Sequence, residues 1–330
     1  MNIFIAKTPY HLILAHAVLL KIKSKHRNYL IYSGKKTSNI NNIIISDLWS
    51  DVLFFNIDIN AYDIGVGNKV KSWVKTKKIN KNGKLFISDD MNWRDQLLAN
   101  YLNYDKKYLI EDGVGSYYKS KLSISVAIAR HTIFRALFYN LNFYYGAVSQ
   151  SKATKYYALT KQGFPWVKDR SKVITIDKYL KIYLNKMQIN SNHSTENTDM
   201  IMLTQPLKES NIMSKKEDLN IHQKLILPFK NRINSILVKK HPREKESFFM
   251  ERVNSLRAKY YNIEFTVSID TRPAEILLFS ISSNTIIVSP VSTALINLKH
   301  LRPDLSIYFT PINNDQSISS IFEDAGVEEI

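Results

Sequence analysis

The sequence predicts an α/β protein made of two doubly wound, Rossmann-like domains, each with a parallel β-sheet covered by helices on both faces. Short runs of β-branched and aromatic residues alternate with longer segments of helical periodicity, a pattern typical of parallel sheets. A polar segment rich in Asn, Ser and Thr, residues 186–199, interrupts the pattern. The alternation then restarts, so we expect one domain over residues 1–190 and a second over residues 191–330.

The first half contains five predicted strands separated by helical segments. Residues 10–23 have apolar side chains spaced by about 3.6 positions, and residues 90–102 form a second helix that Asp89 or Asp90 would cap. The basic and aromatic segment 119–145 is either a buried helix or a surface that faces a membrane or an acceptor. The predicted strands begin at Asn2, Tyr29, Val52, Lys84 and Lys106.

The second half repeats the arrangement with four predicted strands. Each is followed by a segment of helical periodicity, which allows consecutive strands to run parallel. The strands begin at Met200, Ser235, Ile263 and Thr285, and the helices cover residues 215–227, residues 245–260 and two segments that begin at Pro273 and Ser292.

The absence of cysteine excludes several kinds of functional site. The chain has 330 residues, 45% of them hydrophobic. It contains no Cys, and this excludes disulfides, thiolate nucleophiles, zinc ribbons and iron–sulfur clusters. The N-terminal apolar run lacks a preceding basic segment and a cleavage site, and the longest apolar stretch, residues 122–148, is interrupted by Arg130, His131 and Arg135. We therefore expect a cytoplasmic protein without a signal peptide or a membrane span.

A net charge of +17, from 46 Lys and Arg against 29 Asp and Glu, indicates an anionic partner. Nucleic acid, an anionic membrane face and acidic small molecules are the three classes. The cations concentrate in residues 239–245 and in residues 68–84, which form either a solvated loop or a surface for anionic lipid headgroups. No helix-turn-helix, RNP aromatic pair or zinc finger accompanies them, so nucleic acid is not expected.

Polar residues that follow the predicted strands mark the candidate site, because ligands of open parallel sheets bind beyond the carboxyl ends of the strands. Glu111, Asp112 and Gly113 follow the strand at residues 106–110. Two neighbouring carboxyl groups repel each other, which raises one pKa and suits a general base. The alternative is a turn in which a carboxylate caps the backbone.

The segment VKKHPRE follows the strand that begins at Ser235. Lys239 and Lys240 can neutralise a phosphate. His241 can donate a hydrogen bond or a proton to a leaving phosphate, and Pro242 fixes the backbone beside the imidazole. The alternative is a solvated basic loop. Neighbouring cations repel unless an anion lies among them, and we interpret that anion as a nucleotide phosphate.

Two further strand ends complete the pattern. Glu275 begins a helix, where it either compensates the helix dipole or binds ribose hydroxyls. Ser289, Ser292 and Thr293 lie at a strand-to-helix turn, which is either a plain N-cap at Ser292 or a seat for phosphate. A base, phosphate-binding cations, a ribose carboxylate and a hydroxyl-rich helix start form the layout of a nucleotide-sugar transferase.

Short motifs in the chain together resemble those of the bacterial sialyltransferases. They are EDG at residues 111–113, KKHP at 239–242 and SPVST at 289–293. The segment TPYHLILA from Thr8 resembles the first strand-loop-helix unit of lipooligosaccharide sialyltransferases of glycosyltransferase family 52 and of bacterial polysialyltransferases. Family 52 members can carry an aspartate after the first strand of the second domain, where this chain has TQPLKES, with Leu207 near the expected place.

The resemblance implies a GT-B fold whose two domains face a central cleft, the first on the acceptor side and the second binding the donor. It also implies inverting transfer of sialic acid, or a related nonulosonic acid, from its CMP-activated form, with no metal or other cofactor. Asp112, or alternatively Glu111, would be the base, and His241 would act on the departing phosphate. The donor-binding candidates are Lys239, Pro242, Glu275, Ser289, Ser292, Thr293, Thr204 and Gln205, and Gly113, Tyr10 and His11 belong to the acceptor side or its turn.

The implied acceptor is a galactose- or sialic acid-terminated bacterial surface glycan of lipooligosaccharide, O-antigen or capsule. The basic surface would contact the anionic cytoplasmic face of the inner membrane peripherally. Neither the linkage nor the choice between single and repeated transfer is specified. Two alternatives stay open: a GT-B transferase that uses another nucleotide sugar or polymerises polyol phosphate, and a basic nucleic-acid-binding protein.

Overall fold

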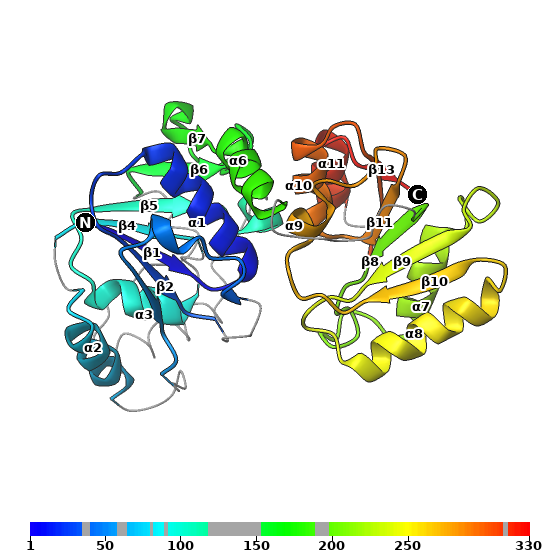
Figure 1. Ribbon diagram of the computed structural model, residues 1–330, viewed down its shortest axis with the longest axis horizontal. Coiled ribbons are helices and arrows are strands. Elements are labelled where there is room, and N and C mark those ends of the chain that lie inside the picture. Colours follow the sequence, from blue (N-terminus) through cyan, green and yellow to red (C-terminus); the bar gives the residue numbers. More distant parts are fainter. Residues whose placement is uncertain are drawn as a thin grey trace. The chain divides into compact units, whose positions relative to one another are not determined.

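The computed structural model of the chain (Figure 1) describes residues 1–34, 40–57, 65–79, 82–88, 92–117, 153–188, 198–312 and 316–330. The chain forms two compact units, Met1–Tyr183 and Leu184–Ile330. Each unit has its own parallel sheet. The expected boundary near residue 190 and the segment 119–145 lie outside the described residues.

The first unit contains a sheet of seven parallel strands in the order β3-β2-β1-β4-β5-β6-β7. The chain moves outward from β1 to β3 and then returns to the other side of β1 with β4, so the strand order reverses between β1 and β4. In doubly wound sheets such a reversal opens a crevice at the carboxyl ends of the strands. The strands are β1 Asn2–Ala6, β2 Asn28–Tyr32, β3 Asp51–Phe54, β4 Lys84–Ile87, β5 Lys106–Ile110, β6 Lys155–Ala158 and β7 Val173–Thr175.

The helices of the first unit begin where short-range signals place them, with one correction. Thr8 caps α1 by accepting a hydrogen bond from the His11 N–H, and Pro9 fills the first helical position, where no N–H is needed. The prediction that Asp89 or Asp90 caps the third helix is wrong. Asn92 caps it by accepting from the Arg94 N–H, because it directly precedes the first helical residue. The helices are α1 Pro9–Ile22, α2 Val66–Thr76, α3 Trp93–Tyr101 and α6 Asp177–Gln188.

The second unit contains six parallel strands in the order β10-β9-β8-β11-β12-β13, with a reversal between β8 and β11. The four strands and four helices predicted here are present, and β12, α11 and β13 extend the alternation to the C-terminus. The strands are β8 Met200–Leu203, β9 Ser235–Lys239, β10 Glu264–Ser268, β11 Ile286–Pro290, β12 Ser306–Thr310 and β13 Glu328–Glu329, and the helices are α7 Lys215–Ile226, α8 Glu246–Lys259, α9 Ala274–Leu278, α10 Thr293–Leu301 and α11 Gln316–Asp324.

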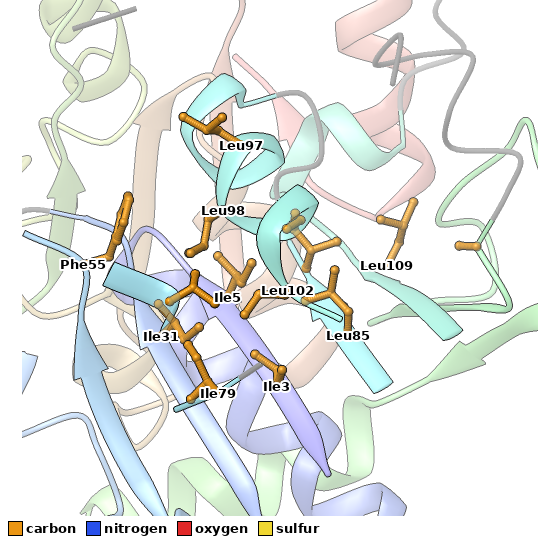
Figure 2. Packing of buried hydrophobic residues seen from close by; sticks show 14 of the residues in the cluster. Ile3, Ile5, Ile31, Phe55, Ile79, Leu85, Leu97, Leu98, Leu102 and Leu109 are labelled. Carbon is orange, nitrogen blue, oxygen red and sulfur yellow. The ribbon is translucent and has the colours of Figure 1, made fainter. Parts of the chain in front are cut away.

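Both faces of each sheet are covered, so the central strands are largely buried and rich in apolar residues. All five residues of β1 are buried. Ile3 and Ile5 pack on the side of α3 with Leu98 (Figure 2), whereas Phe4 points to the other face and stacks on Phe86 with ring centroids 4.3 Å apart. A separate cluster that includes Met202, Val238, Phe249 and Val253 forms the core of the second unit.

Within the described residues, no helix is long and apolar enough to cross a membrane.

Candidate active site

The candidate site of the first unit is at the carboxyl ends of β1 and β5. Tyr10 and His11 lie in the first turn of α1, which follows β1, and Glu111 and Asp112 directly follow β5. The Tyr10 side chain is hydrogen-bonded to Glu111 and the His11 side chain to Asp112, in each case across 101 positions of sequence. The fold therefore places the predicted acidic pair and the predicted acceptor-side residues in one cluster.

Glu111 is fully buried, and both of its carboxylate oxygens are bonded. Oε1 accepts a hydrogen bond from the Tyr10 hydroxyl at 2.6 Å, and Oε2 accepts from the Tyr117 hydroxyl at 2.7 Å and from the Leu159 N–H at 2.8 Å. Burial and the negative charge of Glu111 hold the pKa of Tyr117 well above its usual value, so this hydroxyl keeps its proton. Glu111 is thus held in place by donors from three other segments.

Asp112 has a different environment from its neighbour. Its side chain is 47% exposed, and Oδ1 is hydrogen-bonded to Nε2 of the buried His11. Nδ1 of His11 accepts the Lys7 N–H at 3.4 Å, which places the proton of the neutral ring on Nε2, facing Asp112. Among the described residues, Oδ2 of Asp112 has no hydrogen-bond partner and can accept a proton from a bound molecule.

The turn after Asp112 depends on glycine. Gly113 has φ +83°, in the left-handed region that residues with a Cβ rarely adopt. It begins the short 3₁₀ helix Gly113–Ser116, whose last residue accepts the Asp112 N–H on its hydroxyl at 2.7 Å. This turn fixes the backbone of Asp112 and carries Tyr117 back to Glu111.

In the second unit, the ends of β8 and β9 fix the backbone of His241. Its N–H lies 3.1 Å from the Thr204 hydroxyl oxygen and 2.8 Å from Oε2 of Glu244, and its Nδ1 accepts the Arg243 N–H at 3.1 Å. Burial, followed by the nearby cations Arg243, Lys239 and Lys240, lowers the pKa of His241 to about 3. The imidazole is therefore neutral near pH 7, with its proton on Nε2.

Lys239 and Glu275 are a pair of buried charges next to this loop. Burial lowers the pKa of Lys239 to about 8, against the opposing effect of Asp270 and Glu275, and its ammonium group donates to the Asp270 carbonyl at 3.0 Å. Burial raises the pKa of Glu275, which accepts a hydrogen bond from Asn297 Nδ2 at 2.7 Å. The predicted ribose ligand is thus a buried group with a protein partner.

The serines after β11 are not equivalent. Ser289 is the fourth residue of β11, is fully buried, and donates to the Leu203 carbonyl at 2.7 Å, which joins β11 to β8. Ser292 occupies the N-cap position of α10 with extended backbone, but its side chain makes no capping hydrogen bond. The simpler alternative of a side-chain N-cap is therefore not what the structure has. The carbonyl of Ser292 accepts the Leu295 N–H at 3.1 Å, and its hydroxyl, which caps no N–H of α10, stands beside the N–H groups that begin this helix.

The two units account for the predicted site residues in two groups. The first unit brings together Tyr10, His11, Glu111, Asp112 and Gly113. In the second unit, the side chains of Thr204 and Ser289 bond within the protein, Pro242 is exposed and Gln205 is partly exposed.

Sequence reasoning missed Tyr117, Asp270, Glu244 and Arg252. For Glu244, the local signal was its place three residues after His241, since its other partners Thr204 and Arg252 lie 40 and 8 positions away.

Comparisons with known proteins agree with this architecture. Residues 2–310 match the family model described as alpha-2,8-polysialyltransferase (POLYST). No significant match is found among curated protein sequences.

Solved structures of similar architecture include sugar-nucleotide enzymes. UDP-GlcNAc 2-epimerase from Methanocaldococcus jannaschii has a TM-score of 0.58 at 11% identity, with 100% of this chain and 87% of that chain covered. The S. aureus MnaA–UDP co-structure gives 0.58 at 12% identity, with 98% and 87% covered. UDP-GlcNAc 2-epimerase from Neisseria meningitidis bound to UDP-GlcNAc gives 0.51 at 13% identity, with 99% and 92% covered. The predicted α/β fold with two parallel, doubly wound sheets of the GT-B type is confirmed.

Proposed function

The chain belongs to the alpha-2,8-polysialyltransferase family, and from this premise we propose that it transfers sialic acid from CMP-sialic acid to a sialic acid-terminated glycan by an inverting, metal-independent mechanism. The observation that carries the mechanism is the hydrogen bond between His11 and the half-exposed Asp112. A carboxylate that is fixed on one oxygen and open on the other has the properties of a general base.

Asp112 is the base in this proposal. Through Oδ2 it takes the proton of the acceptor hydroxyl, while the oxygen of that hydroxyl bonds to the anomeric carbon of the donor sugar. The bond between the anomeric carbon and the phosphate oxygen breaks, and CMP leaves with the electron pair. Glu111 is the less suitable base, because it is buried and its oxygens already accept hydrogen bonds from Tyr10, Tyr117 and Leu159. It positions Asp112 through the adjoining backbone.

The second unit binds the departing phosphate. The N–H groups at the start of α10, the hydroxyls of Ser292 and Thr293, and the Nε2–H of His241 are donors for a phosphate, and Lys240 adds positive charge. Because His241 is neutral in the unliganded protein, it acts first as a hydrogen-bond donor. The dianionic phosphate of CMP favours its protonation, which would strengthen that bond as the leaving group acquires charge.

Glu275 takes a role different from the predicted ribose contact. Its carboxylate is buried against Asn297, and its charge is one of those that favour the protonated form of Lys239. We assign it to keeping Lys239 charged beside the phosphate site. Thr204 and Ser289, whose hydroxyls bond within the protein, support the ends of the strands rather than contact the donor.

The basic surface of the first unit is the proposed contact with anionic lipid headgroups. Parallel strands all begin at one edge of the sheet, and the exposed Lys84, Lys106 and Lys155 begin β4, β5 and β6. The exposed lysines at the end of α2, including Lys75 and Lys78, extend this surface. Since Asp112 lies at the carboxyl edge, binding of the opposite edge to a membrane at the cytoplasmic face leaves the base accessible.

The direct test is transfer itself. The purified chain is incubated with CMP-sialic acid and a panel of labelled galactosides and α-2,8-linked sialosides, and the products are read by mass spectrometry. We expect addition of one or more sialic acid units to the sialosides, and no product when a UDP-sugar replaces the donor. Transfer from a UDP-sugar, or no product from CMP-sialic acid with any acceptor, would refute the proposal.

A further inference from the structure

A buried network of charged side chains lies directly behind His241. Glu244, Arg252 and Asp218 are each at least 95% buried, according to their relative exposures of 4%, 4% and 5%. They come from the loop after β9, from α8 and from α7. The transfer mechanism above assigns none of them a role.

Glu244 connects this network to the loop that carries His241. Its Oε2 accepts the His241 N–H at 2.8 Å and lies against the Thr204 hydroxyl. The same hydroxyl oxygen accepts the His241 N–H at 3.1 Å. The backbone of His241 is therefore held by two acceptors that also bond each other, one at the end of β8 and one in its own loop.

The other oxygen of Glu244 is held from the helix side. Oε1 accepts from Arg252 at 2.6 Å, and Arg252 donates two further hydrogen bonds, of 2.9 and 2.6 Å, to Oδ2 of Asp218. The Asp218 backbone carbonyl in turn accepts from His222 at 2.7 Å. The chain of contacts thus runs from the His241 backbone through α8 into the middle of α7.

Such a network is an expensive way to stabilise a fold. Taking carboxylates and a guanidinium out of water costs several kcal/mol per ion before their attraction is counted, and apolar side chains of similar volume often serve stability as well. What charged groups with two or three directional bonds supply is fixed geometry. The geometry fixed here is that of the His241 backbone.

We propose that Glu244 is a positioning residue for His241, holding the Nε2–H of the imidazole where the phosphate leaves. The inference rests on the proposed function for the identity of the reaction, and it adds the residue that orients His241. Arg252 and Asp218 hold Glu244 in turn. A shift of about 1 Å in a catalytic group can lower a rate by about a hundredfold.

Glu244→Gln is the sharpest variant, because the amide keeps the shape of the side chain but replaces one oxygen with a donor. If the NH₂ faces Arg252, two donors meet. If it faces His241, the backbone N–H and the Thr204 hydroxyl lose the carboxylate oxygen as one of their partners. Glu251→Gln is the matched control, since Glu251 is also on this side of the unit, in α8, and makes the same charge change, but its side chain is 47% exposed and pairs with Lys215.

The experiment is a double-mutant cycle of Glu244→Gln with His241→Ala, read as kcat for sialyl transfer. We expect Glu244→Gln to lower kcat by about 10- to 100-fold in the wild-type background and by less than about threefold in the His241→Ala background. Glu251→Gln should lower it in neither. Equal losses in both backgrounds, or no loss in the first, would overturn the positioning role.

A readout without turnover separates this inference from the proposed function. In spectra of ¹⁵N-histidine-labelled protein, Glu244→Gln should shift the ring and backbone nitrogens of His241, and Glu251→Gln should leave them unchanged. An unshifted His241 in Glu244→Gln would refute positioning even if the protein transferred no sialic acid at all. Should Glu244→Gln fail to fold, Glu244→Asp keeps the charge but shortens the side chain by one methylene, and the same shifts decide the question.

Discussion

The carboxylate of Asp112 is hydrogen-bonded to the imidazole of His11, although the two residues are 101 positions apart in the chain. His11 is buried and Asp112 is about half exposed. One oxygen of the carboxylate is therefore fixed by the protein while the other faces solvent. The neighbouring Glu111 has the opposite character, since it is buried with hydrogen bonds on both oxygens. The two acidic residues of the EDG motif consequently have separable roles.

Asp112→Asn should lower kcat for transfer by about 10²- to 10⁴-fold, because the amide cannot accept the proton of the acceptor hydroxyl. The affinity for CMP should stay at the wild-type value, since CMP binding is assigned to the second unit. Initial rates at saturating donor and CMP binding measured by calorimetry check both statements. Wild-type turnover by Asp112→Asn, with Glu111→Gln inactive but folded, would move the base to Glu111.

Tyr10→Phe should destabilise the first unit more than it impairs the chemistry. Removing the hydroxyl takes a 2.6 Å hydrogen bond from a buried carboxylate, which lowers the free energy of unfolding by about 1–3 kcal/mol. Urea denaturation followed by circular dichroism measures the change. Tyr261→Phe is the control, because the Tyr261 side chain is 90% exposed, and it should leave the midpoint unchanged. Equal midpoints for Tyr10→Phe and wild type would contradict the assignment.

The fold could be predicted from the sequence because its signals are local. Runs such as NIFIA and SILVK predict strands wherever they occur, and helical periodicity between them predicts the parallel crossovers. The positions of Glu111, Asp112 and His241 after strands followed from the same pattern. The family motifs then supplied a chemistry that periodicity cannot.

The contacts within the site could not be predicted, because they join segments distant in sequence. Nothing near Glu244 indicates that Arg252 and Thr204 will meet it, and nothing near Asp112 indicates His11. Ser289 and Ser292 look alike in sequence, yet only Ser289 lies within β11, where its side chain turns to the Leu203 carbonyl. The two serines differ in their burial and hydrogen bonding, and both of these depend on the complete fold.

Stability should fall in acid partly because of His16, a core histidine in α1. It donates through Nδ1 to the Leu12 carbonyl at 2.7 Å and accepts at Nε2 from Trp49 at 2.9 Å and Ile45 at 3.1 Å. Burial lowers its pKa from the usual 6.5 to about 4. The unfolded chain therefore binds a proton below about pH 6.5 that the folded chain refuses until about pH 4.

Acid therefore destabilises the folded chain through His16. The contribution of neutral His16 is complete above pH 6.5 and is lost as the pH falls toward 4, by up to about 1.4 kcal/mol per pH unit. Unfolding free energies measured by urea titration from pH 7 to pH 5 check this. Subtracting the same curve for His16→Gln should isolate the slope. Parallel curves for wild type and variant would show that His16 takes up its proton equally in both states.

The exposed lysines of α2 and of the turn that follows it should carry binding to anionic lipid. Lys71, Lys75 and Lys78 are exposed, and each cation near an anionic surface contributes about 1 kcal/mol. Replacing all three with Gln should therefore weaken binding to vesicles of mixed phosphatidylglycerol and phosphatidylcholine by at least about tenfold in cosedimentation. Neither protein should bind vesicles of phosphatidylcholine alone.

A charge-matched control distinguishes this surface from net charge. Lys216, Lys224 and Lys230 are exposed lysines of the second unit, and their replacement with Gln should leave vesicle binding within about twofold of wild type. Equal weakening by both triple variants would mean that total charge, rather than α2, determines binding. Transfer to a soluble sialoside should be the same for the α2 variant as for wild type, because the base lies at the opposite edge of the sheet.

Ser292→Ala should weaken CMP binding by about 10- to 100-fold, because a hydrogen bond to a charged group contributes about 1.5–3 kcal/mol and 1.4 kcal/mol corresponds to a factor of ten. Ser292 precedes α10, and its side chain makes no capping hydrogen bond, so its hydroxyl is available to the phosphate. Ser255→Ala is the control, since this partly exposed serine of α8 donates to the Glu251 carbonyl of its own helix. Calorimetric titration with CMP, and with UMP as the competing pyrimidine, gives the affinities. If Ser292 binds the phosphate, Ser292→Ala should weaken the binding of both nucleotides by the same factor. A loss of affinity confined to CMP would place Ser292 against the cytosine ring and require a different phosphate site.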